Sequence, residues 1–323
     1  MKHKILMAVV RVMAGVTAGV LAIWCIVAQP TPGKNAVSGA KADPMRLRVH
    51  VVALSETMYP RNYQAITNLD RCAGYIAGHF AEAGAQVEPQ EFKVHGKAYR
   101  NIIGRFGAGK GRTLVVGAHY DACDDTPGAD DNASGVAALI ELAYLVGGRA
   151  PDREIELVAY TLEEPPFFRS EWMGSAVHAK RIAEDKRPIT GMIALEMVGY
   201  YSDKWGSQSY PVPMLRLMYP SRGNFVGVIG RWDQGPWIKK VKAGMKGATD
   251  LPVYSIRAPS ALQGVDYSDH LNYWAQGIPA VMVTDTAFLR NRAYHSTGDT
   301  PDRLDYVRMG KVVVAVYESL WKL

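Results

Sequence analysis

The chain has 323 residues, of which 48% are hydrophobic and 21% are charged, an ordinary globular composition with enough length for one large core. Its formal charge is +6, but Lys2, Lys4 and Arg11 lie in the first segment and leave only +3 on the remainder. That charge is too small to indicate a nucleic acid as partner, and three cysteines are too few for a disulfide framework.

The first segment is apolar from Ile5 to Ala28, interrupted only by Arg11. This pattern indicates an export signal, and its length also fits an uncleaved membrane anchor. Ala28 is an acceptable residue at a cleavage point, but Ile26 two places earlier is not, which favours the anchor. We therefore expect a signal peptide or anchor over 1–28, attachment through 5–28, and export of the rest to the periplasm or the extracellular space.

Residues 29–44 are rich in Pro, Gly, Ala, Ser and Lys, which predicts a flexible tether, and the catalytic domain is expected over 45–323. Helical spacing of apolar residues predicts a helix over 62–84 that Gly84 is placed to end, followed by strands over 85–92 and 99–106. Further predicted strands are 113–118, 155–161, 191–195, 225–229, 253–257 and 280–284. Further predicted helices are 133–146, 174–183 and 305–321.

Strands that alternate with helices in this way indicate an α/β sheet. The stretch 201–220 has no clear period and is expected to be a surface insertion. Cys72 and Cys123 are the two cysteines of the domain, and two unpaired side chains is a simpler interpretation than a bridge.

Residues that bind metals recur at the carboxyl ends of these strands, where open α/β sheets place their ligands. Any one of them alone would carry little weight, but together they form the mixed nitrogen and oxygen donor set that zinc accepts. A carboxylate that bridges two ions about 3.5–4 Å apart would let both stabilise an attacking hydroxide. The residues are His119, Asp130, Glu163, Glu164, Glu196 and His295.

Five motifs occur in a fixed order along most of residues 45–323. They are Val116-Gly-Ala-His-Tyr-Asp121, Pro127-Gly-Ala-Asp-Asp-Asn-Ala-Ser-Gly135, Glu163-Glu164, Leu195-Glu-Met197 and Tyr294-His-Ser-Thr-Gly-Asp-Thr300. Each is loose by itself, but their order and spacing resemble the co-catalytic zinc peptidases typified by bacterial leucyl aminopeptidase and glutamate carboxypeptidase, metallopeptidase family twenty-eight. The resemblance implies a three-layer α/β sandwich with a central, mostly parallel mixed sheet flanked by helices.

The resemblance also implies two zinc ions per chain. Asp130 would bridge them, His119 and Glu196 would complete one site, and Glu164 and His295 would complete the other. Many family members have Asp where this chain has Glu196, so the longer side chain must reach its ion by a different backbone position or denticity.

Other roles follow from the same resemblance. Glu163 would be the general base, Tyr294 would donate a hydrogen bond to the oxyanion, and Asp121 would orient His119. The family further suggests a cis peptide bond between Asp130 and Asp131.

Three further features suggest how substrate is bound. The segment 165–173 is rich in Pro, Phe and Trp and is longer than the usual family connection, so it is expected either to form a wall of the substrate site or only to pack against the domain. The segment 264–270 resembles a family segment beside the active site, and its His270 is either functional or structural. In a carboxypeptidase or dipeptidase, Arg169, Arg290 or Arg292 would bind the substrate carboxylate; the alternative is that all three are solvated surface charges.

The sequence therefore predicts a zinc-dependent exopeptidase, an aminopeptidase acting on peptides. The alternatives are a glutaminyl cyclase, which works on this fold with one zinc, a dipeptidase or carboxypeptidase, and an inactive receptor domain. The complete donor set and Glu163 argue against the first and the last of these.

Overall fold

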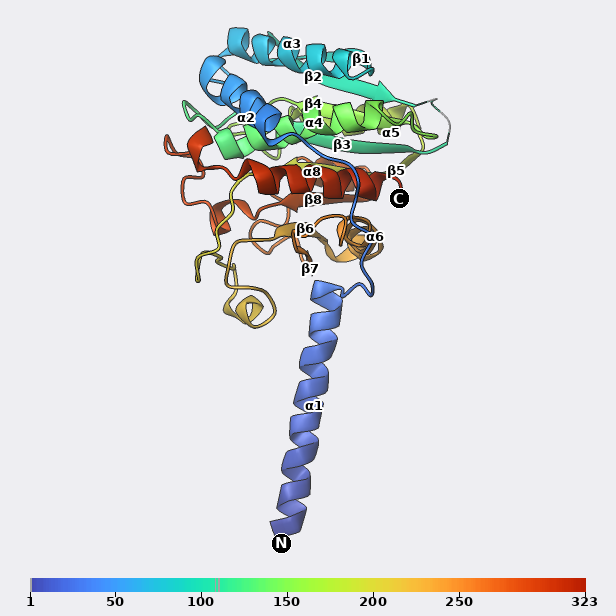
Figure 1. The fold of residues 1–323 in the computed structure, drawn as a ribbon, viewed down its shortest axis with the longest axis vertical. Coiled ribbons are helices and arrows are strands. Elements are labelled where there is room, and N and C mark those ends of the chain that lie inside the picture. Colours follow the sequence, from blue (N-terminus) through green and yellow to red (C-terminus); the bar gives the residue numbers. More distant parts are fainter. Residues whose placement is uncertain (1, 108, 110) are drawn as a thin grey trace.

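The computed structural model describes residues 2–107, 109 and 111–323. Beyond an N-terminal helix, these residues are built around a mixed sheet with the strand order β1-β2-β4-β3-β5-β8-β6-β7 (Figure 1). The strands are β1 (Gln86–Val94), β2 (Lys97–Phe106), β3 (Thr113–His119), β4 (Ile155–Tyr160), β5 (Ile189–Glu196), β6 (Val226–Arg231), β7 (Val253–Ala258) and β8 (Ala280–Thr284).

The four central strands β4, β3, β5 and β8 run parallel to one another. At one edge β2 pairs antiparallel with β4, and at the other β6 pairs antiparallel with β8. Every residue of β3 and β4 is buried because both faces of the sheet are covered, which explains their nearly continuous apolar sequences. All eight strands predicted from the sequence are present.

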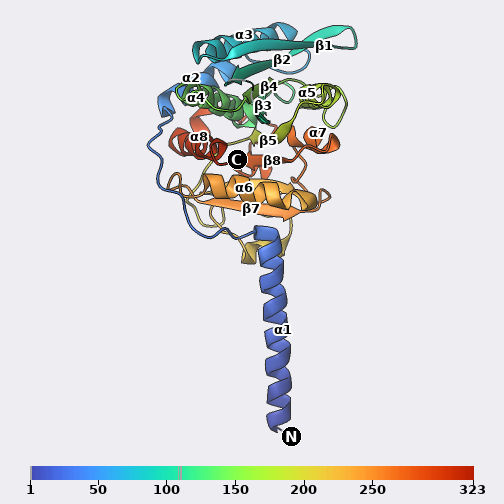
Figure 2. The same cartoon turned by 90° about the vertical axis from the view of Figure 1, so that its right-hand side faces the viewer.

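Helices cover both faces of the sheet, as Figure 2 shows from the side. Helices α2, α3, α4, α6 and α8 pack on one face, and α5 and α7 pack on the other. The predicted three-layer α/β sandwich is therefore confirmed. The helices are α1 (Lys2–Ala28), α2 (Pro44–Val52), α3 (Ile66–Glu82), α4 (Gly135–Gly147), α5 (Gly174–Glu184), α6 (Gly235–Met245), α7 (His270–Ala275) and α8 (Tyr306–Leu320).

The sequence patterns missed three of these helices. Helix α7 is only six residues long, too short to show an apolar stripe, and in α6 the initial Gly-Pro and three lysines obscure the stripe that Trp237, Ile238, Val241 and Met245 form. Helix α2 lies at the start of the predicted domain, where Asp43 caps it by accepting hydrogen bonds from the first backbone amides. The predicted end of α3 is correct, since Gly84 follows it with φ +88°, a conformation that favours glycine.

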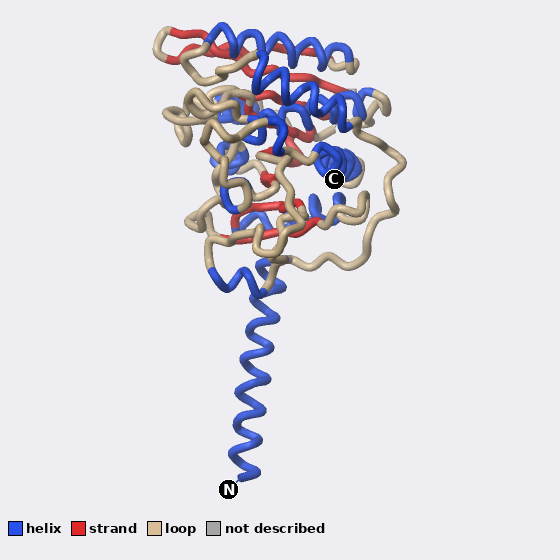
Figure 3. The backbone as a smooth tube through the Cα atoms, turned by 60° about the vertical axis from the view of Figure 1, so that its left-hand side comes forward, coloured by secondary structure: helices blue, strands red, loops and turns tan. Residues whose placement is uncertain are grey.

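Helix α1 stands away from the domain, and Val9–Ala28 is long and apolar enough to cross a membrane. Residues 29–43, here called the strap, then run along the outside of the domain to α2, as the tan segment between helices in Figure 3 shows. A flexible tether is predicted for 29–44, whereas in the structure the backbone and side chains of the strap are hydrogen-bonded to the domain. Asn35 donates to the carbonyls of Ala243 and Gly244, and the Ser38 amide donates to Ala248.

Candidate active site

The predicted metal-binding residues meet at the carboxyl edge of the central strands. His119 ends β3 and Glu196 ends β5, while Glu163 and Glu164 follow β4 closely. His295 lies in the loop that follows β8. Because β4, β3, β5 and β8 are parallel neighbours, residues that are distant in the sequence converge at one edge of the sheet.

Two imidazoles face a group of carboxylates at this edge. The Nε2 atom of His119 lies 3.3 Å from Glu196 Oε2 and 3.8 Å from Glu163 Oε2. The Nε2 atom of His295 lies 3.1 Å from Glu164 Oε2. Each histidine therefore has a glutamate partner of its own within this cluster.

Asp131, and not Asp130, lies between the two histidines. Its Oδ1 is 3.5 Å from His119 Nε2, and its Oδ2 is 3.1 Å from His295 Nε2. Asp130 turns the other way, where its carboxylate accepts hydrogen bonds from the Gly199 amide (3.0 Å) and the Asn291 side chain (2.9 Å). The bridging position predicted for Asp130 is therefore occupied by Asp131, one residue further along the chain.

The cis peptide bond is displaced by the same single step. It joins Asp131 to Asn132, whereas the family resemblance suggested Asp130 and Asp131. The loop that carries it is held from the opposite side by Asp299, whose Oδ2 accepts from the amides of Asp130 and Asp131. Asp299 belongs to the motif at 294–300, so a signal for it was present in the sequence.

Asp121 supports three members of the cluster at once. Its carboxylate accepts hydrogen bonds from the amides of Glu163 (3.2 Å) and Glu164 (3.0 Å) and lies 3.5 Å from Nδ1 of His119. These contacts fix both glutamates and the ring of His119. They are what a carboxylate that orients a metal-binding imidazole would make.

Arg61 is a supporting residue that no sequence signal revealed. It is fully buried, and its guanidinium donates to the carbonyls of Tyr120, Leu54, Pro127 and Gly128. Two of these carbonyls lie in the loop before Asp131, and one directly follows His119. Arg61 thus ties together the two segments that carry these site residues.

The crowding of buried carboxylates changes their protonation. Burial raises the pKa of Glu163 well above its usual range, outweighing the nearby His119, and burial with the charge of Asp131 raises the pKa of Glu164 to about 8. Burial opposes ionisation of Asp131 as well, but hydrogen bonds to His119 and His295 lower its pKa. Like charges packed this closely in a buried site favour a bound cation.

The donor set fits zinc. Two imidazole nitrogens and several carboxylate oxygens are its preferred ligands after thiolate, and Cys123 adds a sulfur close to Glu164 and His295. Among the described residues, Glu164 Oε1 is a buried oxygen without a hydrogen-bond partner, which leaves it free to bind an ion. The structure therefore brings together His119, Glu163, Glu164, Glu196 and His295, and Asp131 lies where Asp130 was expected.

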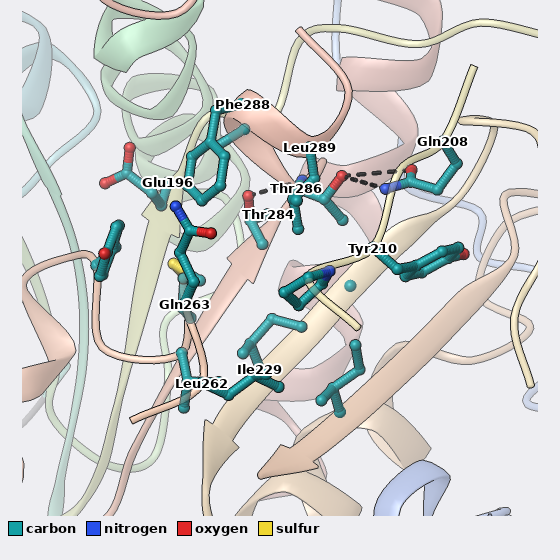
Figure 4. A pocket seen from close by; sticks show the side chains of 18 of the residues that line it. Glu196, Gln208, Tyr210, Ile229, Leu262, Gln263, Thr284, Thr286, Phe288 and Leu289 are labelled. Atoms are coloured by element: carbon teal, nitrogen blue, oxygen red, sulfur yellow. Dashed lines mark hydrogen bonds between the residues drawn. The ribbon is translucent and has the colours of Figure 1, made fainter. Parts of the chain in front are cut away.

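Two cavities meet at this cluster. An acidic cavity contains Asp131, Glu163, Glu164 and His295, and Phe168 and Arg169 from the 165–173 loop line its outer part. An apolar cavity lies on the other side, with Glu196 at its rim (Figure 4). Residues that line the apolar cavity include Ile229, Tyr254, Leu262, Met282 and Phe288, and Glu196, Tyr267 and Tyr294 line both cavities.

Tyr294 stacks on His295 with ring centroids 3.8 Å apart. Burial raises its pKa far above the ordinary value, so the phenol keeps its proton and can donate a hydrogen bond. In the neighbouring segment 264–270, Ser268 donates to Glu196 (2.7 Å), which places this segment beside the site as expected. His270 is buried with its Nε2 2.8 Å from the Val265 carbonyl and is not part of the cluster.

The three arginines considered for substrate binding have different surroundings. Arg169 forms an ion pair with Asp266 (2.7 Å) at the mouth of the acidic cavity. Arg290 is buried and donates to Gln208 and to the carbonyls of Tyr200 and Phe225, so its role is structural. Arg292 is exposed and does not line either cavity.

Comparison with known proteins gives a consistent result. Residues 101–319 match the model of Peptidase family M28. The chain is 47% identical to the uncharacterized protein YfbL of Escherichia coli K12, over 87% of this chain and 88% of that protein. It is 27% identical to leucine aminopeptidase 1 of Ajellomyces capsulatus over 65% of this chain, but it spans only 52% of that longer protein. The crystal structure of glutaminyl cyclase from Bacteroides thetaiotaomicron has the same fold, with a TM-score of 0.67 and 21% identity over 88% of this chain and 99% of that one.

Proposed function

The chain belongs to peptidase family M28 and is a metallopeptidase, and from this premise we propose that it is an aminopeptidase with two zinc ions. The observation that carries the proposal is the position of Asp131 between two histidines, each of which has its own glutamate. One ion would be held by His119, Asp131 and Glu196. The other would be held by Asp131, Glu164 and His295.

Zinc ions held in this way would polarise the scissile carbonyl and lower the pKa of a water molecule. Glu163 is the carboxylate left over after both sites are filled, and it stands 3.8 Å from His119 at the edge of the acidic cavity. A buried carboxylate with a raised pKa can take a proton from the attacking water and return it to the leaving amine. Glu163 is therefore the proposed general base.

Tyr294 is placed to assist the same step. Its ring packs on His295 and faces both cavities, and its protonated phenol would donate a hydrogen bond to the oxygen of the scissile carbonyl as negative charge develops there.

The apolar cavity supports a preference for large apolar residues at the amino terminus of the substrate. Its lining is mainly aromatic and aliphatic, and Glu196 at its rim joins it to the proposed zinc site. Of the three arginines, only Arg169 lines the acidic cavity, and Asp266 neutralises it. This arrangement favours an aminopeptidase over a carboxypeptidase, which needs a free cation for the substrate carboxylate.

A glutaminyl cyclase remains the main competitor because the fold is shared. The test is zinc analysis of protein purified without chelator, combined with a panel of aminoacyl, dipeptide and N-terminal glutaminyl substrates. We expect about two zinc ions per chain and hydrolysis of apolar aminoacyl substrates. One zinc ion at saturation, with glutaminyl peptides cyclised and aminoacyl substrates untouched, would overturn the proposal.

We also propose that α1 stays attached as a membrane anchor. The carbonyl of Ala28 accepts from Lys242 Nζ (2.8 Å) and Ser255 Oγ (2.8 Å), and that of Gln29 accepts from Lys242 (3.1 Å). Cleavage after Ala28 would break up this buried junction. The basic residues Lys2, Lys4 and Arg11 would remain on the cytoplasmic side, with the domain outside.

A further inference from the structure

The end of α1 packs against the loop that connects β5 to β6. Ala28, Leu215 and Tyr219 form a small buried cluster, which Trp24 and Val27 of α1 extend. Figures 1 and 2 both show the short yellow helix of this loop beside the domain end of α1. This short helix, Pro213–Leu217, is here called the loop helix.

The outer face of the loop helix is apolar and uncovered in the described part of the chain. Leu217 is 89% exposed and Met214 is 58% exposed, while Leu215 between them is buried in the cluster with α1. Arg216 is also exposed, and it lines a shallow surface hollow together with Trp205, which is 81% exposed. Apolar tips beside Trp and Arg side chains are typical of segments that enter a membrane interface.

The position of the exposed face of the loop helix beside α1 indicates that its partner is the bilayer. Helix α1 is apolar over Val9–Ala28 and its apolar window is not buried in the domain, so the bilayer surface must lie near residue 28 if α1 spans it. Since Leu215 packs against that end of α1, Met214 and Leu217 must lie at the same level. A surface that is fixed next to the end of a spanning helix is held at the level of the lipid headgroups.

We propose that the loop helix is a second membrane contact, in which Met214 and Leu217 enter the interface of the outer leaflet beside α1. This inference goes beyond the proposed peptidase activity and rests on α1 acting as an anchor. Two contacts restrict tilting of the domain relative to the bilayer. The domain is then held in one orientation, with the apolar cavity on its membrane side, since Tyr254 and Leu262 belong both to that cavity and to the apolar cluster at the end of α1.

The test uses the full chain in vesicles of phosphatidylethanolamine and phosphatidylglycerol. With Cys25→Ser as background, Leu217→Cys carries an environment-sensitive fluorophore, because Cys72 and Cys123 are buried. Val307→Cys is the matched control, since Val307 is 57% exposed but lies on α8. Lipids with a quencher on the acyl chain should quench the probe at 217, at a depth of about 5–10 Å, whereas the probe at 307 should be quenched only by aqueous iodide.

A second variant separates insertion from mere proximity. Met214→Asp in the labelled protein should abolish acyl-chain quenching at position 217 while leaving vesicle binding and peptidase activity in detergent unchanged, because Met214 lines neither cavity. Vesicle-bound protein with an aqueous probe at 217 would overturn the loop-helix contact and leave the anchor intact. Protein that does not sediment with vesicles would overturn both.

A second copy of the chain is the other partner that this face could meet. The unlabelled Leu217→Cys variant addresses it, because two copies that pack through the loop helix would form a disulfide between their introduced thiols under mild oxidation. Such cross-linking, together with the absence of lipid quenching in the labelled protein, would overturn the membrane contact.

Discussion

Buried charge is handled differently at the two ends of the domain. At the carboxyl edge of the sheet, Glu163, Glu164 and Asp131 are packed together with few donors from the chain, and the pKa values of both glutamates are raised. At the end that receives α1, Lys242 is also buried, but its ammonium donates to the carbonyls of Ala28 and Gln29. Burial and nearby Lys246 lower its pKa to about 8.

The partners of a buried charge distinguish a functional one from a structural one. A buried cation whose partners are carbonyls of its own chain joins two parts of the molecule, as Lys242 joins α1 to α6. A group of carboxylates that outnumbers the two histidines beside it keeps an excess of negative charge, which favours an ion from outside the chain. Arg61 is a structural charge in this sense, because its guanidinium donates to four backbone carbonyls, whereas the carboxylates of the cluster are not bound by the chain in this way.

The largest effect on turnover should come from replacing Glu163, the proposed general base at the carboxyl edge of the sheet. Glu163→Gln keeps the shape of the side chain but cannot accept a proton, so turnover should fall about 10²–10⁴-fold. Zinc content and melting temperature should stay within error of the wild type, which elemental analysis and calorimetry would check. Near-normal turnover would remove Glu163 from the mechanism.

The neighbouring aspartates provide the next test, because one faces the metal cluster and the other faces the chain. Asp131→Asn should weaken zinc binding more than about 100-fold, beyond the range usual for groups that only touch a metal ligand. Burial and the adjacent Asp285 raise the pKa of Asp130, which favours its neutral form, so Asp130→Asn should be tolerated within about tenfold. Zinc titration of both variants measures the difference, and equal losses would contradict the assignment of Asp131.

Much of this arrangement could be predicted from the sequence. The strands are continuous apolar runs, and five of the six predicted cluster residues stand at strand ends or in short motifs. Asp131 was missed because three polar residues follow one another at 130–132. Which of the two carboxylates faces the histidines depends on Asp299 and Asn291, which are far away in the chain. The strap was missed because its partners are largely backbone carbonyls of α6, which leave no mark on composition.

Removing the strap at the end of the domain that receives α1 should lower the free energy of unfolding and change catalysis much less. A chain that starts at Ala28 keeps the strap, whereas one that starts at Ala42 keeps the Asp43 cap of α2 but loses the hydrogen bonds of Asn35, Ser38 and Thr31. These bonds are each worth about 1 kcal/mol, part of which is spent on ordering the segment, so the shorter chain should be less stable by about 2 kcal/mol. Urea unfolding of both chains measures the difference, and identical midpoints would mean that the strap is only loosely held.

The smallest effect concerns how substrate lies between the two cavities. Phe168 lines the acidic cavity and contacts Tyr267 edge to face at 6.1 Å, whereas Phe288 lines the apolar cavity and contacts Tyr267 at 5.9 Å. If the first residue of the peptide occupies the apolar cavity, Phe288→Ala should reduce the preference for a large first residue, and Phe168→Ala should instead change the preference at the second residue. An aromatic contact of this kind contributes about 0.5–1.5 kcal/mol, so each change in the ratio of kcat/KM values should be about tenfold or less.

Phe167 is the control for this comparison within the same loop. It is buried against Tyr63 and Trp172, so its replacement by Ala should cost stability without altering either preference. The measurement is a substrate series varied separately at its first and second residues. If Phe168→Ala acted on the first residue, the assignment of the two cavities would be reversed, and the peptide would then have to enter from the side of the domain that faces α1.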